Sequence, residues 1–226
     1  MIVRFEDYVV WECPHCGAKS VDWAIASCNT IGAKIWSDGF MIARMAMPQD
    51  IVTRCWTCGK AFCSQLAKHT IIARDQVSEG DRHYVDWTGD YTAIQEVLTS
   101  EKDLTPELER ELRIRILWAG NHKVRETPSY SDERSVVEMQ IFAAPQDIPE
   151  DEVRENMVKL SEAPDVSPCL RAEVLREMGK FGKAKKVLDE FAKSDTEEFK
   201  NVQKTCEELL AHIKMRDSTV FLRPKF

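Results

Sequence analysis

Two copies of a five-residue element, Cys-x-x-Cys-Gly, constrain the N-terminal part of this 226-residue chain more than any other feature. They are CPHCG at residues 13–17 and CWTCG at residues 55–59. Two cysteines three positions apart on a tight turn can direct both sulfurs to one point, while backbone amides donate hydrogen bonds to those sulfurs. The glycine that follows permits the left-handed conformation that completes the turn. Two such knuckles supply four thiolates, the ligand set of many structural zinc sites.

We therefore predict one structural Zn²⁺ per chain, with Cys13, Cys16, Cys55 and Cys58 as its ligands. Four thiolates leave no open coordination position, which a catalytic zinc needs for its water. A short segment with few large aliphatic side chains is marginal by itself, and zinc bound by thiolates contributes on the order of 10–16 kcal/mol to such domains. The alternative is a thioredoxin-type redox dithiol, but neither copy follows a strand and opens a helix.

The other four cysteines are interpreted differently. Cys28 and Cys63 lack a knuckle partner and are left out of the metal set, and Cys169 and Cys206 lie on predicted helix faces as small core residues. Because no secretory signal is visible, we expect metal ligands and free thiols rather than disulfides.

The charge of the chain argues against a nucleic-acid partner. The net charge is −7, of which residues 1–75 carry +1 and the remainder −8. Nucleic-acid binders usually present a basic surface that displaces counterions from phosphates. Arg4, Glu6 and Asp7 are incompatible with the apolar stretch of a signal peptide, and no uncharged run reaches the length of a membrane span. We expect a cytoplasmic protein without membrane contact and leave its oligomeric state open.

The pattern of the chain predicts an α+β fold in three parts. Residues 1–75 form a zinc ribbon domain of short antiparallel strands, at about 2–11, 33–36 and 40–45. Asp38-Gly39 supplies the tight hairpin turn between the last two strands. Residues 76–90 are a connector, and no regular structure is assigned between residues 65 and 90. Residues 91–226 form an all-α domain of short amphipathic helices.

The helices are predicted from their start signals and their apolar period. Thr105-Pro106 opens a helix with Leu108, Leu112 and Ile116 on one face, and Asn121-His122 is interpreted as its C-terminal cap. Further helices are expected near residues 132–144, 150–160, 168–178, 184–191 and 196–215. The pair at 168–193, broken at Gly179, is similar to a tetratricopeptide hairpin, and an ordinary helical core is the alternative.

The segment between the knuckles resembles a bacterial protein family. Residues 29–39 read NTIGAKIWSDG, and MAMPQD and CWTCGKAF follow. This resembles a group of bacterial proteins with an N-terminal zinc ribbon that read GNT-G-A-x-x-W-S/T-D-G before the second knuckle. The likeness covers residues 11–64 and continues more loosely through 112–125 and 172–188. It implies a ribbon followed by a tetratricopeptide-like helical domain, and no activity. Cys28, where the pattern has Gly, and residues 45–48 depart from it.

The polar residues of this segment suggest a recognition surface. Asn29, Thr30, Trp36, Ser37 and Asp38 are more polar and specific than a ribbon hairpin requires, and we hypothesise that they bind a partner beside the zinc. The alternative is structural: Asp38 makes the turn, Trp36 covers a small core, and the others satisfy loop backbone.

Closed metal coordination and the lack of a catalytic constellation favour a non-catalytic, zinc-stabilised adaptor or regulator that binds another protein. One alternative is nucleic-acid binding through the ribbon, by Trp36, Trp56, Lys34 and Arg44. The other is an enzyme with a site between the two domains, lined by His83, Asp86, Asp90 or His122.

Overall fold

A computed structural model describes residues 4–27, 30, 32–42, 51–77, 91–125, 147–194 and 196–223 of the chain. The chain is α+β and divides into two compact units. Unit 1 comprises Met1–Ala33, Ile42–Leu104 and Tyr130–Ala144, and unit 2 comprises Lys34–Met41, Thr105–Ser129 and Pro145–Phe226. These units divide the chain differently from the predicted ranges 1–75, 76–90 and 91–226.

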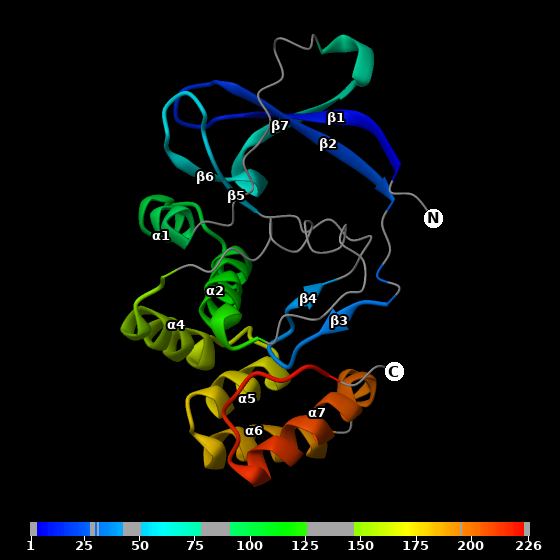
Figure 1. The fold of residues 1–226 in the computed structure, drawn as a ribbon, viewed down its shortest axis with the longest axis vertical. Coiled ribbons are helices and arrows are strands. Elements are labelled where there is room, and N and C mark those ends of the chain that lie inside the picture. The colour runs from blue at the N-terminus through cyan, green and yellow to red at the C-terminus, as the bar shows by residue number, and fades with distance from the viewer. Residues whose placement is uncertain are drawn as a thin grey trace. The chain divides into compact units, whose positions relative to one another are not determined.

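The main sheet of unit 1 is antiparallel and has the strand order β2-β1-β7 (Figure 1). Its strands are β1 (Arg4–Glu12), β2 (Lys19–Ser27) and β7 (Lys68–Ala73). β1 pairs with both neighbours, and its buried Tyr8 stacks on Trp23 of β2, with ring centroids 4.6 Å apart. The first knuckle is the turn between β1 and β2. β7 lies in the region for which the sequence predicted no regular structure.

A second hairpin of unit 1 carries the second knuckle. It consists of β5 (Val52–Arg54) and β6 (Ala61–Cys63), and the short 3₁₀ segments η1 (Ser64–Leu66) and η2 (Arg74–Gln76) flank β7. Helix α1 (Tyr91–Ser100) contacts this hairpin and buries Tyr91, Ala93, Ile94 and Val97.

A side chain of α1 completes the hydrogen bonding of the second hairpin. The Glu96 carboxylate accepts from the Ala61 amide at 3.0 Å and from the Arg54 guanidinium at 2.6 Å. These bonds lower the pKa of Glu96. Helix α1 was predicted to be part of the helical domain, but it belongs to the same unit as the knuckles.

The first segment of unit 2 is a hairpin of two short strands, β3 (Lys34–Ile35) and β4 (Met41–Ile42), of which Ile42 is already counted in unit 1. The Gly39 amide donates to the Trp36 carbonyl at 3.0 Å, and Gly39 has a φ of +83°. The predicted Asp-Gly turn is therefore confirmed. On its other side β3 meets the C-terminal segment: Trp36 bridges to Leu222, and the Arg223 amide donates to the Ile35 carbonyl at 2.9 Å.

Five α-helices are described in unit 2, and three of them begin at a side-chain N-terminal cap. They are α2 (Pro106–Asn121), α4 (Glu150–Glu162), α5 (Pro168–Glu177), α6 (Phe181–Lys193) and α7 (Glu197–Met215), with the 3₁₀ segment η4 (His122–Val124) after α2. The hydroxyls of Thr105, Ser167 and Thr196 accept hydrogen bonds from amides three positions on, as N-caps do. The predicted helix at 132–144 lies outside the described residues.

Each helix of this series contacts the next, and α5 also contacts α7. One core lies among α5, α6 and α7 and includes Leu175, Leu188 and Leu209. A second core joins α2, α4 and α5 through Leu117, Leu160 and Val174. Within the described residues, none of the helices combines the length and apolar character that crossing a membrane requires.

Candidate metal centre

The four knuckle cysteines come together in unit 1. The sulfurs of Cys13, Cys16, Cys55 and Cys58 all lie within 4.8 Å of one another. The Cys13–Cys58 and Cys16–Cys55 sulfur pairs are 3.9 and 3.6 Å apart. Zn–S bonds of about 2.3 Å in tetrahedral geometry place neighbouring sulfurs about 3.8 Å apart. The cluster could therefore hold a metal ion such as zinc and is compatible with a zinc ribbon.

The two knuckles repeat the same backbone geometry. In the first, the Gly17 amide donates to the Cys13 carbonyl at 2.9 Å; in the second, the Gly59 amide donates to the Cys55 carbonyl at 2.8 Å. Both glycines have positive φ, at +75° and +70°. Side chains other than glycine rarely adopt this conformation, so the glycine after each Cys-x-x-Cys has a geometric function.

Backbone amides also point at the first sulfur of each knuckle. The amides of His15 and Cys16 donate to the Cys13 sulfur, and burial nevertheless raises the pKa of Cys13 to about 12. Burial also opposes ionisation of Cys55, but the amides of Cys58 and Thr57 lower its pKa to about 7. Such donors stabilise thiolates, the form in which cysteine binds a metal.

Within each knuckle, the first cysteine is buried and the second is exposed. Cys13 and Cys55 are buried with Phe62 and Ala67, while Cys16 and Cys58 are exposed. The His15 side chain of the first knuckle reaches the second hairpin, and its Nε2 lies 3.1 Å from the Ala61 carbonyl oxygen. The cluster therefore joins the β1–β2 and β5–β6 hairpins, whose described residues share a small apolar core.

Of the cysteines left out of the metal set, Cys63 is buried in β6 and is not one of the clustered four, and Cys28 lies outside the described residues.

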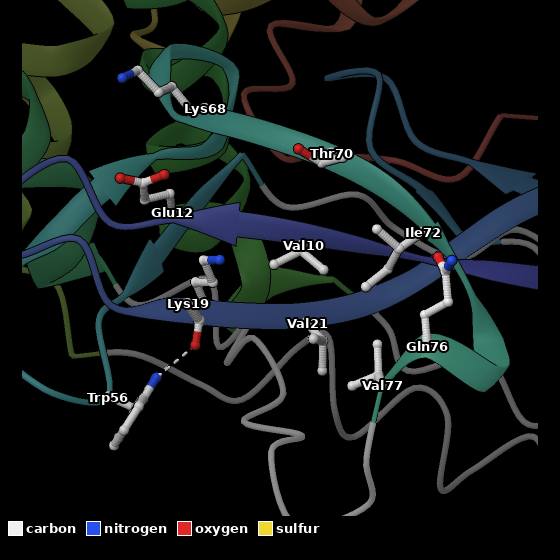
Figure 2. Close-up of a pocket in the computed structure, with 10 residues that line it drawn as sticks. All are labelled: Val10, Glu12, Lys19, Val21, Trp56, Lys68, Thr70, Ile72, Gln76 and Val77. Carbon is white, nitrogen blue, oxygen red and sulfur yellow. Dashed lines mark hydrogen bonds between the residues drawn. The ribbon is translucent and has the colours of Figure 1, made fainter.

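A groove of about 630 Å³ lies on one face of the β2-β1-β7 sheet (Figure 2). The strand register arranges this face in rows. Glu12 of β1 lies opposite Lys19 of β2 and Lys68 of β7, and the next row is Val21, Val10 and Thr70.

Trp56 of the second knuckle lies at the charged end of this groove. Its indole N–H donates to the Lys19 carbonyl at 3.0 Å, and its side chain is 53% exposed (Figure 2). At the other end lie Ile72, Gln76 and Val77. The sequence prediction missed this groove because it requires the sheet register and a strand, β7, that the sequence did not predict.

The predicted partner-binding residues that the structure describes are divided between the two units. Trp36, Ser37 and Asp38 are buried within unit 2, while Thr30 is exposed in unit 1 and Asn29 lies outside the described residues. The Phe221 amide donates to the Ser37 hydroxyl, and the Trp118 indole donates to the Asp38 carbonyl at 3.0 Å. These contacts favour the structural alternative for the Trp36-Ser37-Asp38 sequence.

A buried polar cluster around Asp38 was not predicted. The Asn121 amide donates to Asp38 at 3.0 Å and to Glu177 at 2.9 Å, so Asn121 is not the simple helix cap that we expected. The Arg125 guanidinium also pairs with Asp38. Burial, with Glu173 and Asp38 nearby, raises the pKa of Glu177 well above its ordinary value.

No protein-family model, curated protein or solved structure matches this chain. The fold and the site define the class of protein: an α+β chain with four clustered cysteines that could hold a metal ion such as zinc.

Proposed function

We propose that this chain is a non-catalytic adaptor or regulator, stabilised by one structural Zn²⁺, that binds an extended segment of another protein on the sheet of unit 1. Zinc in a ribbon is supported by the sulfur separations and by the amide donors of both knuckles. With all four coordination positions taken by thiolates, the metal has no place for a substrate or a reactive water. Thiolate ligands also suit a reducing compartment, so we propose a cytoplasmic location.

The groove beside the second knuckle carries the proposal of a protein partner. Its centre is apolar, with Val10 and Val21, Ile72 lies toward the far end, and its charged end has two lysines around one glutamate. An extended peptide presents alternate side chains to such a face and can leave its polar backbone at the rim. The two lysines at the rim favour a peptide that carries an acidic side chain next to apolar ones. Exposed Trp56 adds a large amphipathic contact of the kind that is common in protein interfaces.

The helical part of the protein is proposed to be tetratricopeptide-like. In support, α5 and α6 are joined at Gly179, whose φ is +71°, and the Lys180 amide donates to the Leu175 carbonyl at 2.8 Å. Contacts of α5 with both α6 and α7 fit a series of helical hairpins.

Nucleic-acid binding is the less favoured alternative. Of the four residues predicted for it, Trp36 is buried in unit 2, Lys34 is in unit 2, Trp56 is in unit 1, and Arg44 lies outside the described residues. The enzyme hypothesis stays a prediction, because His83, Asp86 and Asp90 lie outside the described residues.

A displayed library of ten-residue peptides, panned against the zinc-loaded protein, tests the proposal. We expect selected peptides to alternate apolar residues with at least one acidic residue, and to lose at least tenfold in affinity for the Trp56→Ala/Lys68→Glu variant. Ile71→Ser is the matched control, because Ile71 is 63% exposed on the opposite face of β7. Selected peptides that bind the double variant as well as the parent, or binding of single-stranded DNA instead of peptides, would contradict it.

A further inference from the structure

Two cysteines of unit 2, far from the metal centre in sequence, lie in direct contact. Cys169 is the second residue of α5 and Cys206 lies in the middle of α7, 37 residues later. Their sulfurs are 2.9 Å apart, closer than either sulfur pair quoted for the metal cluster. A disulfide has an S–S bond of about 2.05 Å, so a displacement of less than about 1 Å would join them.

The hydrogen bond between the two thiols shifts their pKa values in opposite directions. Bonding to Cys206 and burial raise the pKa of Cys169, whereas the hydrogen bond from Cys169 lowers the pKa of Cys206. The Arg223 guanidinium, bound to Thr205 and Glu208 on the same helix, favours negative charge on both sulfurs. Cys206 is therefore the first of the two to ionise while Cys169 keeps the shared proton, and thiolate is the form that attacks a disulfide.

The two sulfurs also differ in access to solvent. Cys206 is 2% exposed and belongs to the core among α5, α6 and α7, while Cys169 is only partly buried at the edge of that core. Cys169 is thus the more accessible residue of the pair, and the Cys206 sulfur lies 2.9 Å from the Cys169 sulfur. This is the arrangement of an attacking and a resolving cysteine.

We propose that Cys169 and Cys206 are a reversible thiol–disulfide site that reacts with low-molecular-weight disulfides of the glutathione class. Cys206 first loses its proton to solvent and then accepts the proton of Cys169, so that the Cys169 thiolate can attack one sulfur of the disulfide RSSR. A mixed disulfide forms and RS⁻ leaves. Cys206 then gives its proton to the released RS⁻ and attacks the Cys169 sulfur, and the second RS⁻ departs and takes up a proton from solvent. In total two protein thiols are oxidised to one disulfide, and RSSR is reduced to two RSH.

The product would connect the start of α5 to the middle of α7 across a buried core. Cross-linking residues so far apart in sequence restricts the unfolded chain and stabilises the folded one. Because both residues are in unit 2 and neither is a metal ligand, the reaction would leave the four knuckle cysteines unchanged.

The experiment uses the full-length, zinc-loaded protein, treated with oxidised glutathione, alkylated without denaturant and mapped by peptide mass spectrometry. We expect a peptide cross-linked through Cys169 and Cys206, unchanged zinc content, and a higher unfolding temperature that dithiothreitol reverses. Cys206→Ser should accumulate glutathione on Cys169, and Cys63→Ser should behave like the parent.

Two results would overturn the proposal. The first is that both cysteines are recovered as reduced thiols, alkylated or not, after oxidant treatment, while circular dichroism shows that the protein is still folded. The other is a cross-link that instead joins either residue to a knuckle cysteine. If Cys206→Ser does not fold, the parent cross-link map still decides between these outcomes.

Discussion

The carboxylate of Asp38, in the turn between β3 and β4, forms an ion pair with the guanidinium of Arg125 across 87 residues of sequence, and both side chains are almost completely buried. Arg125 also stacks over Phe40 at 4.1 Å from the ring centroid and donates to the Trp118 carbonyl at 2.5 Å. The hairpin of unit 2 is thus joined to the end of α2 by charge, by hydrogen bonds and by ring contacts.

Replacing Asp38 by Ala should destabilise unit 2 by about 3–5 kcal/mol, because it leaves a buried arginine without its counter-charge. Urea unfolding, followed by hydrogen exchange of the α2 amides, measures this loss. Asp189→Ala is the control, since Asp189 pairs with Lys185 on the surface of the same unit. That change should cost less than about 1 kcal/mol. Equal losses for the two variants would be inconsistent with a structural ion pair at Asp38.

Asp217 should make the stability of unit 2 depend on pH. Hydrogen bonds from the Thr219 hydroxyl and amide and from His212 outweigh burial and lower the pKa of Asp217 to about 2. Since the folded pKa lies below the ordinary value of 3.8, this stabilisation is fully present above about pH 4 and is lost as the pH falls toward 2. Allowing for partial exposure, Asp217→Asn should cost on the order of 1 kcal/mol at pH 7 and almost nothing at pH 2.

The variant Thr219→Val provides the matched comparison for Asp217. It removes the hydroxyl donor and keeps the carboxylate, so the measured pKa of Asp217 should rise toward 3.8 in an NMR titration. An unchanged pKa in this variant would show that the hydroxyl does not hold the carboxylate in its charged form.

Gly120 marks a close approach of α2 and α4. A Cβ at this position would lie 2.9 Å from Cγ1 of Val153, closer than side-chain carbons approach one another. Gly120→Ala should therefore destabilise unit 2 by about 1–3 kcal/mol, although alanine is the better helix former. Adding Val153→Ala should recover part of that loss. A double-mutant cycle by thermal unfolding measures the coupling, and strictly additive effects would contradict the proposed contact.

The knuckle cysteines and Cys63 should respond differently to substitution. Cys16→Ser removes one exposed ligand of the cluster and should lower metal content and unfold unit 1, because three thiolates no longer fill the tetrahedral site. Cys63→Ser should retain the full metal content, since Cys63 is a core residue of β6 outside the cluster. Elemental analysis of both purified variants checks this, and loss of metal from Cys63→Ser would mean that the ligand set is wrong.

The parts of the structure that were predictable from sequence depend on local interactions. Each knuckle is defined by bonds within five residues, such as that from Gly17 to Cys13, and helix starts such as Thr105 depend on an amide three positions away. The Asp-Gly turn at 38–39 is local in the same way. These features need no knowledge of the rest of the fold.

What sequence did not predict requires partners distant along the chain. The Trp36-Ser37-Asp38 sequence was correctly placed in a hairpin, but its packing depends on Trp118, Asn121 and the C-terminal segment. β7 has little apolar alternation and is a strand because β1 lies beside it. Helix α1 has an ordinary apolar face, and its contacts with β5 and β6, among them the bond from the Ala61 amide to Glu96, assign it to unit 1. Register and long-range hydrogen bonds, which decide these cases, cannot be deduced from residue type and spacing alone.

The most direct test of the proposed zinc centre is elemental analysis of the full chain combined with chelation and hydrogen exchange. One zinc per chain is expected, and its removal by a chelator at neutral pH should unprotect the amides of β1, β5 and β6, while those of α5, α6 and α7 stay protected. A purified protein that contains no metal and keeps the protection of β5 and β6 would contradict a zinc-dependent fold of unit 1.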